Sequence, residues 1–296
     1  MNNNLTTTNQ NSKIALAKSK GLLDITNKIL SKNKDTWIEN LFQWADQNDI
    51  PNHTWVKDED FNEGGYHIGI PRDTTKLLSM EILRLHDLKI DLLADEIFNL
   101  IQLKELSIKN CALKNLSNKI SKLTNLENLY LAKNNLYQLP SELQHLSKLK
   151  KIHLHTNNFL DIPEILYGMK SLSHMCINGC NIREISPNIK KLVTLHEFYI
   201  HSNQLEKLPY ELFELKNLKD LRLHDNNLIT LPNNINNLTN LEFFTLHKTN
   251  LKSLPDNIIA LNKIKYLFIH ECLALSITNQ QAEWINNLKI KSEYIY

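Results

Sequence analysis

Nine consecutive segments of this chain share one pattern, and each begins 23 residues after the last. The segments follow the form LxxLxLxxNxLxxLPxxIxxLxx, and they start at Met80, Leu103, Leu126, Leu149, Leu172, Leu195, Leu218, Leu241 and Ile264. A fixed period of this length indicates a solenoid, in which each repeat buries its apolar edge only by stacking on its neighbours. Because no insertion interrupts the period, every residue from 80 to 286 can be assigned to a face of that solenoid.

Seven positions of each repeat are apolar and predict the inside of the coil. In the third repeat these are Leu126, Leu129, Leu131, Leu136, Leu139, Leu143 and Leu146, and across the array the exceptions are Gln281 and Ala274. The LxL segment has the period of a short strand with one buried side, and the LPxxLxxL half predicts a helical or irregular outer side. Parallel strands of successive repeats then line a concave face, which predicts an α/β fold.

Position nine of the repeat follows the strand, where a side chain must satisfy backbone groups that the inward bend buries. Asparagine occupies this position in four repeats, as Asn134, Asn157, Asn203 and Asn226. Other residues replace it at Leu88, Cys111, Cys180, Thr249 and Cys272. We interpret these cysteines as structural, because they stand where the repeat requires an inward side chain.

The sequence outside the repeats divides into three further parts. Residues 1–12 are rich in Asn and Thr and are expected to be disordered, and residues 13–79 are expected to form a helical N-terminal cap that ends in a half repeat. Within that cap, Ile25, Ile29 and Leu30 indicate one helix, and Thr36-Trp37-Ile38-Glu39 fits a capping box that opens a second. Nine repeats occupy 80–286, and residues 287–296, with Trp284, close the last repeat.

Composition excludes several classes of protein. The 296 residues carry a formal net charge of +2, so the chain lacks the basic excess of a dedicated nucleic-acid binder. The N-terminus has no apolar segment typical of a signal peptide, and no stretch predicts a membrane span. Four cysteines provide no disulfide framework. We therefore expect a protein of a reducing compartment.

The 23-residue form resembles the typical leucine-rich repeats of bacterial and eukaryotic signalling proteins. Trp44-Ala45-Asp46-Gln47-Asn48, followed by Ile70-Pro71-Arg72-Asp73, is similar to the segment that leads into the repeats of bacterial cytosolic members. In size and layout the chain resembles effectors of intracellular bacterial pathogens, and Glu293-Tyr294-Ile295-Tyr296 resembles a type IV secretion signal. The resemblance implies a leucine-rich repeat solenoid in the bacterial cytoplasm, translocated into a host cytosol if it is such an effector.

Related effectors that are ubiquitin ligases have shorter repeats with a doubled LPxLP signature and a separate catalytic domain. The longer repeats of this chain, and the few residues after residue 286, depart from that pattern. Ribonuclease inhibitor, another leucine-rich repeat protein, covers an enzyme and blocks its active site. The resemblance therefore implies binding rather than catalysis, with a host protein or another bacterial effector or enzyme as the partner.

Outward side chains of the strands occupy repeat positions three, five and seven. Position seven holds six of the twelve histidines, four of them in consecutive strands, and positions three and five add aromatic and charged residues. Folding does not require aromatic rings on a solvent-facing sheet, and Tyr, Phe and Arg together are typical of interface hot spots. We predict these partner-binding residues: Tyr130, His153, His155, Glu197, Tyr199, His201, Asp220, Arg222, His224, Phe243, His247, Tyr266, Phe268 and His270.

Other interpretations compete for this face. Exposed histidines can persist in drifting copies of one ancestral repeat without any role. Adjacent histidines about 5 Å apart could share Zn²⁺, although an open sheet offers no third and fourth ligand. Cys176, with His153 on the neighbouring strand and His174, could form a nucleophilic pair, but amides committed to a sheet leave no oxyanion hole. Acidic residues interrupt the lysines, which argues against a nucleic-acid track.

We therefore predict a non-enzymatic module without cofactor or metal, monomeric when alone, that binds a protein partner on its concave face. It would act as a bacterial effector or as an inhibitor that occludes a partner enzyme, with no role for nucleic acid or membrane. The alternative is a metal-dependent or cysteine-based enzyme that uses the concave His and Cys residues.

Overall fold

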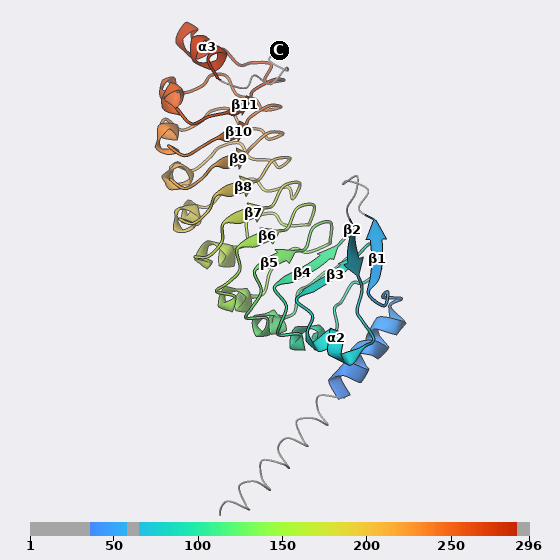
Figure 1. Cartoon of the computed structure of the whole chain (residues 1–296). Helices are drawn as coiled ribbons and strands as arrows, with labels where there is room; N and C mark the ends of the chain where they lie inside the picture. Colours follow the sequence, from blue (N-terminus) through green and yellow to red (C-terminus); the bar gives the residue numbers. More distant parts are fainter. Residues whose placement is uncertain (1–35, 58–64, 289–296) are drawn as a thin grey trace, which may run out of the picture.

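The computed structural model describes residues 36–57 and 65–288 of the chain. Within these ranges nine short strands pair in chain order into one parallel sheet (Figure 1). The strands are β3 (Ile82–His86), β4 (Glu105–Lys109), β5 (Asn128–Tyr130), β6 (Lys151–His153), β7 (His174–Cys176), β8 (Glu197–Tyr199), β9 (Asp220–Arg222), β10 (Phe243–Thr245) and β11 (Tyr266–Phe268). Each strand begins 23 residues after the previous one, as the repeat pattern predicts.

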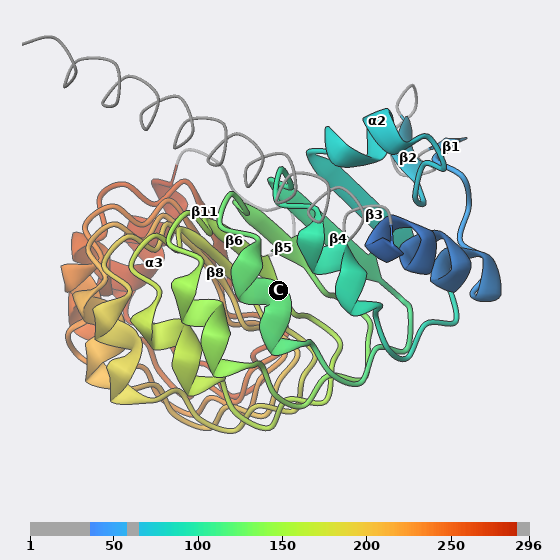
Figure 2. The ribbon, with the colours of Figure 1, turned by 90° about the horizontal axis from the view of Figure 1, so that it is seen from below.

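The outer side of the coil consists of short 3-10 helices, one after each strand from β3 to β10. They are η1 (Asp95–Asn99), η2 (Asn118–Lys122), η3 (Ser141–His145), η4 (Glu164–Gly168), η5 (Pro187–Lys191), η6 (Tyr210–Glu214), η7 (Ile235–Asn237) and η8 (Asp256–Ala260). Figure 1 shows them along the outside of the curve, and Figure 2 shows the successive turns of the coil lying one behind another. The fold is a leucine-rich repeat solenoid with the sheet on its concave side, which confirms the predicted fold class.

The core follows the inward repeat positions. Leu129, Leu131, Leu136, Leu143 and their equivalents in the first eight repeats are fully buried, and the buried apolar residues form one continuous cluster from the N-terminal helix to the last helix. Stacking repeats into one core makes each repeat depend on its neighbours for stability.

The asparagines of position nine bond the backbone as predicted. Asn134 Oδ1 accepts hydrogen bonds from the N–H groups of Cys111 and Leu113, and its Nδ2 donates to the Ile108 carbonyl at 2.7 Å. Where cysteine replaces asparagine, the thiol takes over only the donor role, as Cys111 Sγ does toward the Leu85 carbonyl at 3.2 Å. All four cysteines of the chain are free thiols.

Position eight, just before the asparagine, adopts the left-handed backbone region in every one of the nine described repeats. Glycine fills it once, at Gly179, whereas Lys133, Thr156 and Asp225 adopt φ angles of 55°, 56° and 55°. This conformation is costly for residues with a Cβ, and most of all for a β-branched residue such as Thr156. The tight turn after each strand therefore stores strain, which the asparagine network offsets in the four repeats that have Asn at position nine.

The N-terminal cap contains a helix and a hairpin. Residues 36–47 are helical, with Ile38, Leu41 and Ala45 buried against the core and Trp37 and Trp44 partly buried. The hairpin pairs β1 (Thr54–Lys57) with β2 (Gly65–Ile68) in antiparallel fashion, an element that the sequence did not predict. A short helix, α2 (Thr74–Leu78), follows, and Ile70 and Leu77 are fully buried in the register of the half repeat. The predicted disordered segment 1–12 and the helix predicted around Ile25 lie outside the described residues.

The ninth repeat ends in an α-helix, α3 (Asn279–Asn286), where the other repeats have 3-10 helices. Thr278 and Gln281 form its capping box, and Gln281 Nε2 also donates to the Leu254 carbonyl at 3.0 Å. These bonds explain the polar residue at an inward position, since Gln281 is 1% exposed but fully bonded. Leu273 and Ala274 lie exposed in the preceding turn. Residues predicted to close this end beyond Leu288, such as Ile290, lie outside the described part.

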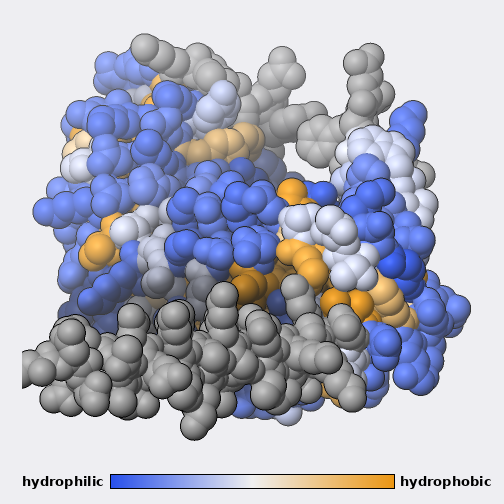
Figure 3. Space-filling model, turned by 60° about the horizontal axis from the view of Figure 1, so that its bottom comes forward, coloured by the Kyte–Doolittle hydropathy of each residue, from blue (hydrophilic) through white to orange (hydrophobic). Residues whose placement is uncertain are grey.

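Figure 3 shows one side of the molecule, where hydrophilic residues cover most of the coloured surface and hydrophobic residues form smaller areas between them. In the described ranges no helix combines the length and the apolar character needed to cross a bilayer.

Candidate partner-binding surface

The register of the sheet sets residues of the same repeat position side by side. Phe243 pairs with Asp220 on one side and Tyr266 on the other, and Thr245 pairs likewise with Arg222 and Phe268. All fourteen predicted site residues occupy positions three, five or seven, and each is half-buried, whereas the leucines between them are buried. The concave face therefore carries these side chains as neighbours in rows that run across the strands.

Arg222 on β9 is the centre of the most connected group, which we call the Arg222 cluster (Glu197, Tyr199, Asp220, Arg222 and Phe243). Its guanidinium lies 4.2 Å from the Tyr199 ring centroid and 4.8 Å from that of Phe243. Its Nη2 is 2.9 Å from Asp220 Oδ2, and its Nε also donates to that carboxylate. The Tyr199 hydroxyl donates to Glu197 at 2.7 Å and lies 3.1 Å from Asp220. The guanidinium is thus fixed in place, while its side chain keeps 34% exposure.

Aromatic rings extend this cluster toward the C-terminal end of the sheet. The Phe243 ring lies 5.2 Å from Tyr266 and 5.3 Å from Phe268, both in tilted contact. Phe268 in turn approaches His247 at 6.3 Å. Three aromatic side chains from two adjacent strands therefore form one half-buried apolar patch beside a fixed cation.

Four histidines at position seven stack face to face, and we call them the histidine ladder (His201, His224, His247 and His270). Successive ring centroids are 4.1, 4.2 and 4.3 Å apart, with interplanar angles of 12°, 11° and 12°. The register of the strands fixes this spacing, since each ring lies one strand from the next. Nδ1 of His224 is hydrogen-bonded to the Thr245 hydroxyl at 2.7 Å, and Nδ1 of His201 to that of Ser202 at 3.1 Å.

Two rings of the ladder, His201 and His224, are uncharged at neutral pH. Burial, followed by the neighbouring Arg222, lowers the pKa of His201 from 6.5 to about 4. Burial together with the flanking His201 and His247 lowers the pKa of His224 to about 3. The pKa of His247 is also lowered, first by burial and then by His270. This agrees with like-charge repulsion between stacked rings, although desolvation is the larger cause.

The remaining predicted residues form separate contacts. Tyr130 and His153 meet edge to face at 4.7 Å, and burial lowers the pKa of His153 to about 4. His155 lies beside the Thr156 hydroxyl at 3.4 Å. Within the described residues, no ring contact or hydrogen bond connects these three side chains to the Arg222 cluster. The fourteen residues therefore divide into a C-terminal group of eleven and an isolated group of three.

A second concave group at the N-terminal end was missed from the sequence. Tyr66 of the hairpin lies 5.4 Å from the His86 ring, and its hydroxyl is 3.3 Å from His86 Nδ1. Arg84 forms an ion pair with Glu105 at 2.6 Å and lies 5.5 Å from the Tyr66 ring. Arg84, Glu105 and His86 follow the repeat columns, but Tyr66 precedes the repeats and carried no periodic signal.

Cys176 does not have the features of an activated nucleophile. Although it stands at an outward position, it is 7% exposed. Burial raises the pKa of its thiol to about 12, and Sγ donates to Asn178 Oδ1 at 2.8 Å rather than to a histidine. A thiol with this pKa is protonated at neutral pH, which argues against the cysteine-based alternative.

Metal binding by the ladder meets a geometric obstacle. Nitrogen lone pairs lie in the plane of the imidazole ring, so parallel rings direct them side by side instead of toward one point. Zinc sites require ligands that converge tetrahedrally at about 2.1 Å. Nowhere in residues 36–57 and 65–288 do three or more His, Cys, Asp or Glu side chains form such a group.

No family model and no curated protein matches this sequence. Among solved structures, a leucine-rich repeat protein of Leptospira interrogans is similar, with a TM-score of 0.54 and 22% sequence identity. The similarity covers 72% of this chain and 71% of that chain. At this identity the likeness shows the shared solenoid fold.

Proposed function

We propose that this chain is a non-enzymatic module that binds a protein partner on the concave face of its sheet, over β8 to β11. The leucine-rich repeat fold supports protein interaction in general. The particular support for this surface is the Arg222 cluster together with the rings of Tyr266 and Phe268. Aromatic residues and arginine that are centrally placed and partly desolvated dominate the binding energy of many interfaces.

The observation that supports the proposal most strongly is that the guanidinium of Arg222 is already held in place before any partner is present. Asp220 binds it through Nε and Nη2, and the Tyr199 and Phe243 rings flank it. Ordering a flexible arginine at an interface costs conformational entropy, and a side chain that is already ordered avoids most of that cost. The solenoid core does not require this arrangement, because none of these side chains lies at an inward repeat position.

Charge on the surface indicates the chemistry of the partner. Arg222 offsets Asp220, whereas Glu197 is contacted by the Tyr199 hydroxyl and by His174 Nε2 at 2.9 Å. His201 and His224 beside this group are neutral at pH 7, because burial lowers the pKa of each ring well below 6.5. The surface therefore carries two carboxylates, Glu197 and Asp220, and one fixed guanidinium next to apolar rings. A partner with a basic side chain and an apolar anchor complements it.

The test is to capture partners from bacterial and host lysates and then to measure the affinity of each captured protein directly. Arg222→Ala, Tyr266→Ala and Phe268→Ala should each weaken binding by about 2 kcal/mol or more, which is about thirty-fold. Tyr210→Ala is the matched control, since Tyr210 is an aromatic on the outer side with 64% exposure. It should leave the affinity unchanged, and circular dichroism should show that all four variants fold.

A different pattern of affinities would contradict binding on the concave face. If a partner's affinity survives all three concave substitutions but falls on replacement of Trp37 or Trp44, while the chain stays folded, the N-terminal cap is the binding site.

Two narrower roles, a bacterial effector and an inhibitor that occludes an enzyme, rest on the resemblance to known leucine-rich repeat proteins. For a captured enzyme, an activity assay with wild type and Arg222→Ala tests the inhibitor role. Occlusion of the active site predicts inhibition by the wild type and weaker inhibition by the variant. For the effector role, a reporter fused to the chain should enter the host cytosol during infection. If it stays in the bacterium, the protein acts there.

A further inference from the structure

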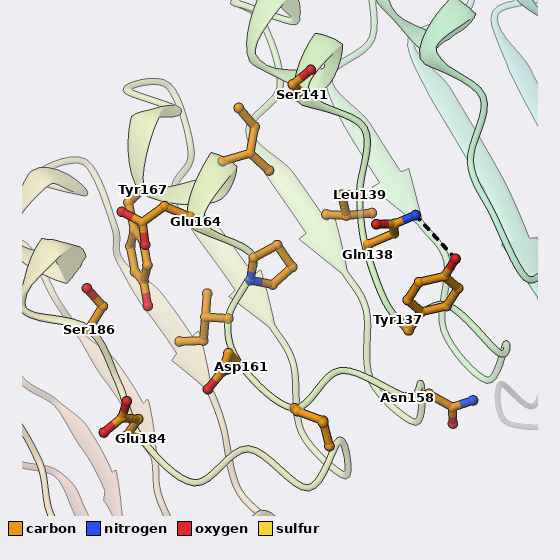
Figure 4. A pocket seen from close by; sticks show the side chains of 14 residues that line it. Tyr137, Gln138, Leu139, Ser141, Asn158, Asp161, Glu164, Tyr167, Glu184 and Ser186 are labelled. Carbon is orange, nitrogen blue, oxygen red and sulfur yellow. Dashed lines mark hydrogen bonds between the residues drawn. The ribbon is translucent and has the colours of Figure 1, made fainter.

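A groove of about 710 Å³ lies on the outer flank of the solenoid, between η3 and η4 and away from the concave face. We call it the flank groove. Figure 4 shows that two kinds of side chain line it from different sides. Asp161, Glu164 and Glu184 lie on the side of Tyr167, whereas Tyr137 lies across the groove beside Gln138.

The acidic side of the flank groove lacks the cation that an equivalent site in the same chain possesses. Three repeats earlier, Asp95 is bonded by the Ser117 hydroxyl at 2.8 Å and by Lys119 Nζ at 2.7 Å. The same repeat positions here hold Glu164, Ser186 and Asn188, and the Asn188 amide donates to Glu164 in place of a lysine.

No lysine or arginine lines the flank groove. Arg183, next to Glu184 in sequence, instead donates its Nε to Gln204 at 3.3 Å. None of the three carboxylates forms an ion pair with another residue of the described ranges. Three negative charges therefore converge without an internal counter-ion.

The apolar side comes from repeat position twelve, which holds an aromatic or aliphatic residue in four of the nine repeats: Tyr137, Leu160, Ile229 and Leu275. Repeat position twelve is charged in five of the nine repeats: Asp91, Lys114, Arg183, Glu206 and Lys252. In the third and fourth repeats, which supply the apolar side of the flank groove, it is Tyr137, 57% exposed, and Leu160, 68% exposed. Large apolar side chains on neighbouring repeats, left in water beside a carboxylate group, are typical of a surface that a partner covers.

The pKa of the Tyr167 hydroxyl reflects burial first and then the negative charge of the three carboxylates. Its ring is 2% exposed, and burial and then the three carboxylates raise the pKa of its hydroxyl, while the Ser186 backbone bonds to it. The hydroxyl stays protonated and gives the acidic side of the groove a neutral polar wall.

We propose that the flank groove binds an extended basic peptide segment of a protein, with a lysine or arginine next to an apolar side chain. Successive side chains of an extended segment point to opposite sides, so the cation can meet Glu164 and Glu184 while its neighbour contacts Tyr137 and Leu160. This site is separate from the concave surface, and neither proposal depends on the other.

The test uses defined peptide probes and the full chain. The peptide Gly-Arg-Leu-Arg-Gly, acetylated and amidated at its ends, is titrated into labelled protein and followed by NMR. Gly-Glu-Leu-Glu-Gly and Gly-Arg-Gly-Arg-Gly are the comparison probes. The first should shift signals within residues 137–186 and bind with the highest affinity. The glycine peptide should bind more weakly, and the acidic peptide should not bind.

Two variants and one control assign the effect to the groove. Glu164→Gln combined with Glu184→Gln should weaken binding about five-fold, the size expected for two exposed charge pairs. Leu160→Ser should also weaken it, and neither change should affect folding, because the side chains are exposed. Glu206→Gln, an exposed carboxylate outside the groove, should have no effect.

Several outcomes overturn the proposal. They are absence of binding at millimolar peptide, equal binding of the acidic peptide, shifts confined to another face, and affinity that the carboxylate variants do not change. A response to arginine peptides that ignores the leucine would mean that the groove attracts any cation, and it would also refute the peptide site.

Discussion

Replacing Asn203 with alanine should destabilise the protein far more than replacing His201, only two residues away. Asn203 Oδ1 accepts from the N–H groups of Cys180 and Ile182 at 2.9 and 3.0 Å, and Nδ2 donates to the carbonyls of Ile177 and Ile200 at 3.0 Å. Alanine leaves two buried N–H groups without an acceptor. Since each such group costs about 1 to 3 kcal/mol, the loss should be about 2 to 6 kcal/mol.

The control is His201→Ala, which removes a half-buried ring whose Nδ1 bonds only the neighbouring Ser202 hydroxyl. It should cost less than about 1 kcal/mol. Asn203→Cys should fall between the two, because a thiol at this position donates but does not accept, as Cys111 does. Urea unfolding followed by circular dichroism measures all three. A loss below about 1 kcal/mol for Asn203→Ala, or equal losses for Asn203→Ala and His201→Ala, would refute the assigned faces of the repeat.

Three further predictions follow from the turns and the concave face. His201 and His224, with pKa values of about 4 and 3 against an ordinary 6.5, should titrate low by NMR. Because the folded-state pKa lies below the unfolded one, the stability linked to each ring is complete above about pH 6.5 and is lost as pH falls toward 4. The loss at pH 5 should be about 1 kcal/mol per ring after solvent screening. Folded-state pKa values at or above 6.5 would contradict this. Thr156→Gly should raise the free energy of unfolding by up to about 1 kcal/mol and Gly179→Thr should lower it, since both positions have positive φ. If urea unfolding shows changes of the same sign for both variants, the turn is not strained. Cys176 should resist iodoacetamide at pH 7.5 in peptide mass analysis, because its pKa is about 12, and rapid modification would revive the cysteine-based alternative.

The sequence predicted the features that follow from the 23-residue period: which side chains are buried, which point outward and which lie side by side. Leu129 and Leu131 are buried and Tyr130 is outward because the alternation within a strand admits no other arrangement once one edge must be covered. Asn134 could be assigned its inward network for the same reason. The rows of the concave face also followed, since stacked repeats bring equal positions together.

Features that depend on side-chain rotamers or on residues outside the period were not predictable. The columns indicated that His201 and His224 are neighbours, but not that their rings stack 4.1 Å apart or that Cys176 is buried. The left-handed turn at position eight gave little signal, because glycine occurs there only as Gly179. Tyr66 reaches His86 from a hairpin with no periodic pattern, and the three-dimensional contact alone identifies it.

The most direct test of the concave-face proposal is site-specific photo-crosslinking in the presence of a captured partner. A benzophenone amino acid replaces Phe268 in one variant and Tyr210, exposed on the outer side, in another. If the partner binds the concave face, position 268 crosslinks to it and position 210 does not. Crosslinking from position 210, with none from 268 in a folded variant that still binds, would show that the partner covers the outer side and that the concave surface is not the binding site.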